Sequence, residues 1–503
     1  MSANLGPRKD LQSFILKVKT DNSGETNDDQ FEIPTSGVGY NYTVDWGDNN
    51  IDENVTGVAI HTYDIPGEYI IKIKGDFPRI LFNNSGDKDK LLEIKQWGNI
   101  EWLEMESAFF GCSNLDVTAT DVPNFSSSLT SLRNMFGDCV NLKGNLSFNI
   151  WDISNIQLLG GVSGNQRLGI FQGCTNFNQP LGNWDTSNVI DLRACFYYCS
   201  NFNQDLGSWD VSNVELMGGN NAQGRESGIF SGCISFNNGG SDRIKNWNTS
   251  KVIHLHFAFS GCTNFNQPLN WDTSNVITMR GMFGPTFGNS HRVEKFNQDL
   301  DWNTSKVTNM TSMFNRCRDF NGDISSWDVS KVEDFNFMFE LTESFNRNIN
   351  SWVTSSITEL ISTFRWAVSF NQPLNNWDVS NVTSFGGFNR GMFESSNFNQ
   401  PLDQWDVRSA TNMRNMFRSN DAFDQNLSNW EPISLTIGND WLIGGGLSTA
   451  NYDALLIAWS NLTLQNDVNF HAGNSKYTSA GETAKNSIIT NYNWSFTDGG
   501  LEN

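Results

Sequence analysis

Two consecutive stretches decide the fold: WNTSKVTNMTSMFNRCRDFNGDISS (residues 302–326) and WDVSKVEDFNFMFELTESFNRNINS (residues 327–351). Each has 25 residues, begins with Trp, and carries Met-Phe and then Phe-Asn at the same positions. One short unit cannot bury its own aromatic rings, whereas neighbouring copies can bury each other's. The sequence therefore predicts a stack of equivalent repeats. The repeat begins at Trp151, Trp184, Trp209, Trp247, Trp271, Trp302, Trp327, Trp352, Trp377, Trp405 and Trp430.

The Phe-Asn-Gln stretch near the end of each repeat is predicted to belong to the core. A Phe at a fixed position of every repeat packs on its neighbours, and the adjacent Asn bonds the backbone of the next repeat. A row of aromatic and amide side chains that binds sugar is the alternative interpretation. The first residues of these stretches are Phe177, Phe202, Phe236, Phe265, Phe296, Phe320, Phe345, Phe370, Phe398 and Phe423.

The fold class predicted for the chain is mainly β with short helical turns. A short strand is expected at the Val-x-x-Met or the Asn-Gln stretch, and a helical turn at Met-Phe-x-x-Cys. Regular repeats of about 25 residues occupy residues 151–430, and looser first copies occupy residues 77–150. These repeats are expected to form the coils of a solenoid.

The repeats resemble those of the BspA-type leucine-rich-repeat surface proteins and of mycoplasma lipoproteins. The resemblance covers roughly residues 77–503 and implies a leucine-rich-repeat-like solenoid on a surface-displayed adhesion protein. Residues 1–10, read as an N-terminal extension, contain neither an apolar leader nor a lipobox. This departure leaves open whether the protein is lipid-anchored, or instead belongs to a virus particle.

The N-terminal residues 11–76 follow a different pattern. Strands are predicted at 14–19, 40–48 and 69–74 because apolar residues alternate there. The turn Trp46-Gly47-Asp48, followed by HTY at residues 61–63 and PGEY at residues 66–69, closely resembles a PKD-type domain. That resemblance implies an immunoglobulin-like β-sandwich.

At the other end, residues 431–503 lose the repeat and are predicted to form a small α/β cap. Helices are expected at 451–459 and 479–492, the second with its N-cap at Thr478 or Ser479. A strand is expected at 468–470, and the Trp494-Ser495-Phe496 stretch closes the chain. A unit without the repeat pattern would shield the open core of the last coil.

The composition excludes several classes of partner. The chain has 33 Lys and Arg against 55 Asp and Glu, a net charge of −22. This charge repels the phosphates of nucleic acids and disfavours an anionic membrane surface. No stretch approaches 18 consecutive apolar residues, so no membrane insertion is expected.

The eight cysteines are predicted to be structural rather than catalytic. Seven of them occupy one repeat position, and Cys195 is the exception. One small thiol per repeat fits a buried row of free cysteines. Disulfides and a metal site remain as alternatives, although no CxxC pair is present. The seven are Cys112, Cys139, Cys174, Cys199, Cys233, Cys262 and Cys317.

An Asp follows the Trp in most repeats, and its predicted role is to cap a local turn. In Asp-x-Ser the carboxylate can accept from the backbone two residues later. Asn248 and Asn303 replace Asp in two repeats, as such a turn permits. No metal site is predicted and no cofactor is expected, with calcium on the Asp row as the alternative. The Asp residues are Asp152, Asp185, Asp210, Asp272, Asp328, Asp378 and Asp406.

Insertions interrupt the repeat at residues 160–169, 218–228, 284–294 and 386–391. Each contains one Arg, which is unusual in so acidic a chain. Insertions in stacked repeats emerge as loops that often bind a ligand, and harmless loop growth is the alternative. The ligand-binding residues predicted in these loops are Asn165, Arg167, Asn220, Arg225, His291, Arg292, Phe388 and Arg390.

Three functions are compatible with these patterns, and the first is predicted. It is a non-enzymatic adhesion or receptor-binding protein, displayed extracellularly or on the cell surface, that binds a cell-surface glycan or protein. The second is a structural or receptor-binding protein on a bacteriophage virion, where other virion or surface-assembly proteins would be partners. The third is a polysaccharide-degrading enzyme. No motif for a nucleophile, a zinc protease or a nucleotide site is present, so no catalytic residue is predicted.

Overall fold

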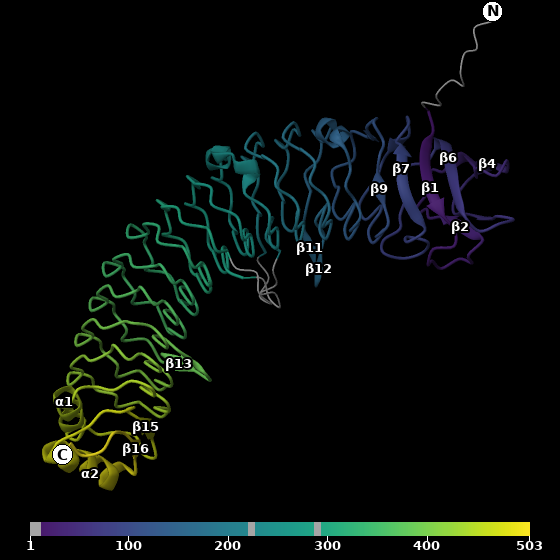
Figure 1. The fold of residues 1–503 in the computed structure, drawn as a ribbon. Coiled ribbons are helices and arrows are strands. Elements are labelled where there is room, and N and C mark those ends of the chain that lie inside the picture. The colour runs from purple at the N-terminus through teal and green to yellow at the C-terminus, as the bar shows by residue number, and fades with distance from the viewer. Residues whose placement is uncertain (1–11, 220–226, 286–292, 503) are drawn as a thin grey trace, which may run out of the picture. The chain divides into compact units, whose positions relative to one another are not determined.

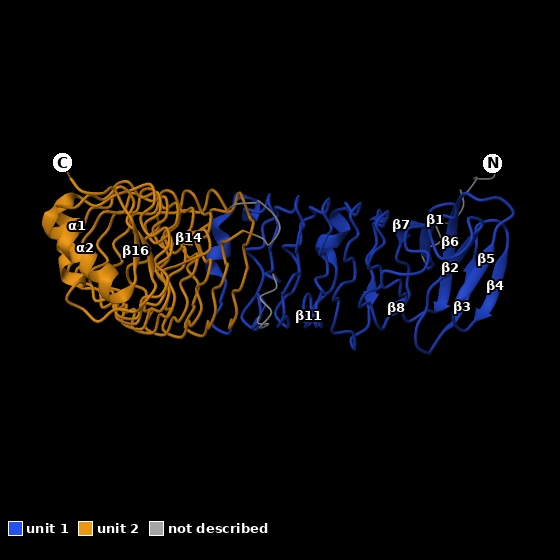
Figure 2. Cartoon of the chain, turned by 90° about the horizontal axis from the view of Figure 1, so that it is seen from below, with its two compact units in different colours: residues 1–251 blue, residues 252–503 orange. Residues whose placement is uncertain are grey.

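The computed structural model describes residues 12–219, 227–285 and 293–502. It is mainly β with few helices, as the sequence predicts. The chain divides into two compact units, residues 1–251 and residues 252–503, which are coloured separately in Figure 2. No helix among the described residues combines the length and the apolar character needed to cross a membrane.

The first unit begins with a six-stranded sheet in the order β4-β3-β6-β1-β7-β9. The strands predicted at 14–19, 40–48 and 69–74 are present as β1, β3 and β6. A separate pair of antiparallel strands, β2 and β5, completes this region. The bounds are β1 (Phe14–Lys19), β2 (Gln30–Ile33), β3 (Asn41–Asp45), β4 (Ile51–Val55), β5 (Ala59–Thr62), β6 (Glu68–Asp76), β7 (Leu91–Gln96) and β9 (Asp116–Val117).

The six-stranded sheet does not end at residue 76. Strand β1 pairs antiparallel with β6 on one side and with β7 on the other, and β7 pairs in parallel with β9. The parallel pairing between β7 and β9 already has the direction used by the repeats. The N-terminal strands and the first looser repeats are therefore joined by one sheet.

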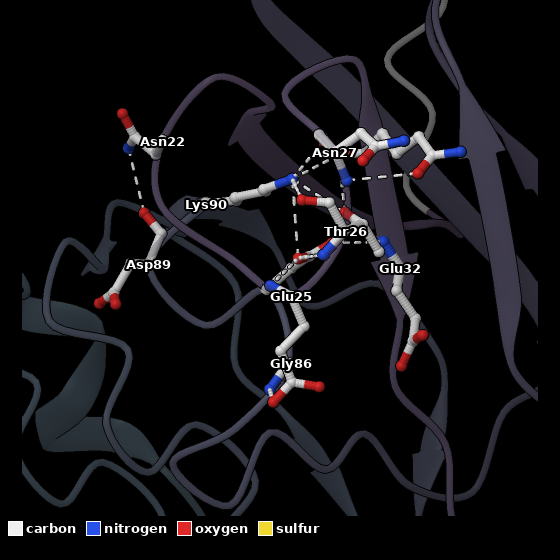
Figure 3. Close-up of polar contacts among 10 residues, drawn as sticks. Asn22, Glu25, Thr26, Asn27, Glu32, Gly86, Asp89 and Lys90 are labelled. Carbon is white, nitrogen blue, oxygen red and sulfur yellow. Dashed lines mark hydrogen bonds and ion pairs between the residues drawn. The ribbon is translucent and has the colours of Figure 1, made fainter.

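A buried ion pair fastens a loop of the N-terminal region to the segment before β7 (Figure 3). The Lys90 ammonium lies 3.7 Å from the Asp87 carboxylate, and neither side chain is exposed. The ammonium donates to the carbonyl oxygens of Thr26, Asn27 and Gln30 at 2.7–3.1 Å. Thr26 and Asn27 lie in the loop between β1 and β2, and Gln30 is the first residue of β2.

In each unit the repeats are joined by single parallel β-bridges. The first unit has the series Ser131, Leu158, Asp191 and Leu216. The second unit has His254, Thr278, Asn309, Asp334, Glu359, Ser384, Asn412 and Ile437. Asn309 lies in the Val-x-x-Met stretch, so the strand expected there is present as a bridge of one residue.

The Met-Phe-x-x-Cys stretch forms consecutive β-turns, so the prediction of a helical turn there is wrong. Its backbone bonds alternate: the N–H of Cys317 bonds the carbonyl of Phe314 three residues earlier, whereas the N–H of Phe314 bonds Met338 of the next repeat. The third residue of each of two turns is left-handed, Ser312 with φ 58° and Arg316 with φ 63°, because this type of turn requires a positive φ there. This alternation satisfies the backbone within a repeat and between repeats at once.

The core of the repeats consists of stacked aromatic rings, as the sequence predicts. In the second unit the Phe of Met-Phe stacks on its counterpart in the next repeat with ring centroids 5.5–5.8 Å apart. Trp302, Trp327, Trp352 and Trp377 form a second stack with centroids 6.1–6.3 Å apart. The Trp327 indole N–H also donates to the Leu300 carbonyl of the preceding repeat, at 2.8 Å.

The end of the chain contains the two predicted helices, α1 (Thr449–Trp459) and α2 (Ser479–Tyr492). The Thr478 hydroxyl accepts from the N–H of Ala480 and so caps α2. The parallel strands β15 (Asn469–His471) and β16 (Ser495–Thr497) pair beside them. The buried Trp459 donates to the carbonyl of Trp430, which continues the hydrogen-bond pattern of the repeat tryptophans.

The remaining elements are short. Parallel strands β8 (Glu101–Trp102) and β10 (Asn124–Phe125) belong to the first repeats. The hairpin strands are β11 (Val162–Ser163) with β12 (Gln166–Arg167), and β13 (Gly386–Gly387) with β14 (Arg390–Gly391). The 3₁₀ segments are η1 (Leu146–Ile150), η2 (Asn238–Gly240) and η3 (Asp242–Asn246).

Candidate functional site

The cysteine row is structural. All eight cysteines are free and buried, as predicted. The Cys139 and Cys199 thiols donate to the carbonyls of Phe109 and Phe171 in the preceding repeat, at 3.2 and 2.7 Å. Burial raises the pKa of the Cys139 thiol well above its ordinary value, which disfavours the nucleophilic thiolate. Thr342 takes the same position in its repeat and donates to Phe314 in the same way.

The Asp residues after Trp cap their turns, as predicted. The Asp328 carboxylate accepts from the N–H of Ser330 at 3.0 Å, and Asn303 accepts from Ser305 at 3.1 Å. Hydrogen bonds from Ser330 lower the pKa of Asp328 below its ordinary value. Within the described ranges, no three His, Cys, Asp or Glu side chains are grouped to hold a metal ion.

Replacing Asp328 with Ala is expected to lower the free energy of unfolding by about 1 kcal/mol at neutral pH, because the turn loses its acceptor. Asp328→Asn keeps an acceptor and should be nearly neutral. Since the folded-state pKa of Asp328 is lowered, its stabilisation is present above the unfolded pKa, about 3.9, and is lost as pH falls below it. Urea denaturation of both variants from pH 7 to pH 3 measures this. An equal loss in both variants at pH 7 would contradict the capping role.

The Phe-Asn-Gln row also contributes to the structure rather than to a sugar site. Phe345 and Phe370 are fully buried, with ring centroids 5.8 Å apart. The Asn346 side-chain oxygen accepts from the N–H of Asn371 in the next repeat, at 3.0 Å. The amide oxygens of Asn321 and Asn371 do the same for their successors. The predicted role of this Asn, bonding the backbone of the next repeat, is confirmed.

In the first unit the insertion at 160–169 forms the hairpin β11–β12, which projects from the repeats (Figure 1). Asn165 lies at its turn. The Arg167 guanidinium lies over the ring of Tyr197 in the next repeat, 4.1 Å from the centroid. This contact combines a positive charge with an aromatic face.

In the second unit the insertion at 386–391 forms the hairpin β13–β14 (green in Figure 1). Phe388, at its turn, is 75% exposed, and the Arg414 guanidinium lies 4.9 Å from its ring centroid. The Arg390 guanidinium lies 5.0 Å from the ring of Phe337. The Arg418 guanidinium donates to the Asn389 side chain at 3.4 Å.

Glycines at the base of both hairpins are required by close packing. A Cβ at Gly391 would lie 1.7 Å from the Asn415 carbonyl oxygen, and a Cβ at Gly169 would lie 1.7 Å from that of Ala194. Both carbonyls belong to the next repeat of the same unit. The two hairpins therefore leave their repeats at equivalent places, which explains the glycines that flank these insertions.

The structure thus brings four predicted residues, Asn165 and Arg167 in one unit and Phe388 and Arg390 in the other, onto two hairpins. The other four, Asn220, Arg225, His291 and Arg292, lie outside the described residues. Sequence reasoning missed Arg414 and Arg418, because they belong to a repeat without an insertion. A signal was present: Arg193 and Arg414 each lie two residues after the bridge position of the repeat that follows a hairpin.

A family model described as "Mycoplasma protein of unknown function, DUF285" matches residues 80–162, 162–223, 224–297, 285–390 and 388–440. These matches fall on the repeats, including both described hairpins. No curated protein and no solved structure is significantly similar to the chain.

Proposed function

The chain belongs to the DUF285 family, and we propose that it is a non-enzymatic adhesion or receptor-binding protein displayed extracellularly or on the cell surface. In this proposal the stacked repeats form a leucine-rich-repeat-like solenoid, and the N-terminal strands form a PKD-type sandwich. The solenoid presents its loops to a glycan or protein receptor on another cell. Membership in a family of mycoplasma repeat proteins is compatible with a surface location.

The roles of the chemically reactive side chains support a non-enzymatic function. The thiols are buried in hydrogen bonds to backbone carbonyls. The carboxylates after Trp are used as turn caps. His61 lies 2.8 Å from Asp48 beside the Trp46 ring, within the N-terminal strands. Each of these groups already has a structural use.

The observation that carries the proposal is the arginine–aromatic contact on each described hairpin. Each pairs the hairpin with a neighbouring repeat: Arg167 with Tyr197, and Phe388 with Arg414. Aromatic and Arg side chains are the types most enriched among residues that dominate binding energy. If the two insertions had no ligand, nothing would favour an arginine–aromatic contact on both of them.

The test measures binding of the labelled full chain to candidate host cells. The Arg167→Ala/Arg390→Ala double variant is expected to bind about tenfold more weakly, as for the loss of about 1.4 kcal/mol of contact energy. Its melting temperature should be unchanged, because both side chains lie at the surface. Arg408→Ala is the control, since Arg408 is exposed and pairs with Asp406 in a turn after Trp. Unchanged binding of the double variant would rule out the hairpins as the binding loops. Loss of binding in EDTA would instead point to calcium.

A further inference from the structure

The surface around β13–β14 concentrates arginine and aromatic side chains in a chain of net charge −22. It is formed by four consecutive repeats of the second unit. Two of its contacts place a guanidinium over a ring, Arg390 over Phe337 and Arg414 over Phe388. The arginine–aromatic surface consists of Phe337, Trp366, Phe388, Arg390, Arg414 and Arg418.

Some arginines near this surface form close ion pairs with carboxylates, and others do not. Arg365 bridges Glu340 at 2.8 Å and Glu394 at 3.2 Å, and Glu394 also accepts from the N–H of Gly391 at the base of the hairpin. This trio holds the hairpin but leaves no net positive charge. Arg414 lies 3.9 Å from Asp440, at the limit of an ion pair.

Arg390 and Arg418 differ from these arginines in their acidic neighbours. In the part of the chain that the structure describes, no carboxylate lies within 4.0 Å of either guanidinium, whereas Arg408 and Arg414 each have one and Arg365 has two. Two guanidinium groups at one hairpin therefore remain able to pair with an anion from outside the chain.

Two rings of this surface occupy left-handed turn positions of the repeat. Phe337 has φ 61° and Trp366 has φ 59°, a left-handed backbone that bulky residues rarely adopt. Ser362 holds the position of Phe337 in the next repeat, and Ser395 holds that of Trp366. Trp366 is nevertheless 43% exposed. Other repeats hold bulky residues in the same conformation, Phe257 at the position of Phe337 and Leu341 at that of Trp366, so the conformation belongs to the repeat turn, and the exposure of Trp366 is what distinguishes this surface.

We propose that the arginine–aromatic surface binds a carboxylated glycan, an inference that rests on the proposed function and names its ligand. The exposed ring of Phe388 offers a flat apolar face against which the C–H face of a sugar ring stacks. A guanidinium offers parallel N–H donors that match the two oxygens of a carboxylate. Arg390, on the same hairpin, and Arg418, which donates to the side chain of Asn389 at the hairpin turn, supply these donors.

A glycan fits this surface better than a protein does. The core of a protein interface is contiguous and apolar. Here Asn389 follows Phe388 at the hairpin turn, and Ser395 and Ser419 take the position of Trp366 in the next two repeats. A surface that combines rings with polar side chains suits a ligand whose own surface alternates C–H faces with hydroxyl and carboxylate groups.

The test uses the full chain and immobilised hyaluronan and polysialic acid, which carry carboxylates without sulfate, with neutral dextran as comparator. The wild type is expected to bind a carboxylated polymer and not dextran. Arg390→Ala/Arg418→Ala should weaken this binding at least tenfold, and Phe388→Ala should also weaken it. Arg390→Lys/Arg418→Lys keeps the charge but loses the paired donors, so its affinity for the carboxylated polymer should lie between those of the wild type and of Arg390→Ala/Arg418→Ala. Arg408→Ala is the matched control, and melting curves should coincide for all five proteins.

The outcomes separate this inference from the proposed function. Binding to cells without binding to either carboxylated polymer would overturn the inference and leave the proposed function standing. Equal binding to dextran would overturn the role of the carboxylate. Cell binding that is lost after protease treatment of the cells but survives sialidase and hyaluronidase would assign the surface to a protein partner. Binding to neither cells nor polymers would contradict both proposals.

Discussion

Replacing Phe370 with Ala is expected to lower the free energy of unfolding by about 3–5 kcal/mol. Phe370 is fully buried and stacks on the rings of Phe345, Phe364 and Phe398, at centroid distances of 5.8, 4.1 and 6.1 Å. Ala would remove these contacts and leave a cavity. The neighbouring rings cannot collapse into it, because each is also held by the next repeat. Urea denaturation followed by Trp fluorescence measures the loss.

The matched control is Phe388→Ala. Phe388 is the same residue type in the adjacent region of the same unit, but it is 75% exposed. Its replacement should change the free energy of unfolding by less than about 0.5 kcal/mol, as for ordinary surface positions. Equal effects of the two substitutions would mean that the Phe row is not the core of the repeats.

Replacing Lys90 with Met is expected to cost about 3–5 kcal/mol, because it leaves the buried Asp87 charge without its cation. The carbonyl oxygens of Thr26, Asn27 and Gln30 would lose the ammonium that donates to them. Asp87 would keep its donors, the N–H groups of Glu25, Thr26 and Glu32, but no positive charge would balance it. Chemical denaturation of the full chain reports the change.

A second variant separates the ion pair from simple loss of packing. In Lys90→Met/Asp87→Asn both charges are absent, so the double variant should be destabilised by less than the sum of the two single variants. Lys95→Met is the control, since the Lys95 side chain is 41% exposed and pairs with Glu93 at the surface. A loss below about 1 kcal/mol in Lys90→Met would contradict an essential role for the pair.

The features that the sequence predicted correctly depend on the repeat or on neighbours in the chain. A Phe or Trp that returns every 25 residues must face the core, because only stacking of copies can bury it. The turn caps of Asp328 and Asn303 involve a residue two positions away, so their spacing is visible in the chain. The helices at 451–459 and 479–492 were predicted from local signals in the same way.

The candidate site was predicted only in part. The insertions pointed to Phe388 and Arg390, whereas Arg414 and Arg418 contact that hairpin from the next repeat. The ion pairs of Arg365 with Glu340 and Glu394 also join three separate repeats. No spacing within one repeat reveals such contacts.

By itself, the sequence determined the length of the repeat, the residues that face its core and the Asp-capped turn that follows the Trp of each repeat. These features follow from periodic burial and from hydrogen bonds between near neighbours. Only the tertiary structure decided that Lys90 reaches the loop after β1, that Arg390 lies over the ring of Phe337, and that Arg418 contacts the side chain of Asn389. The reason is physical: each of these contacts joins residues that are distant in the chain, so it forms only after the fold has brought their segments together.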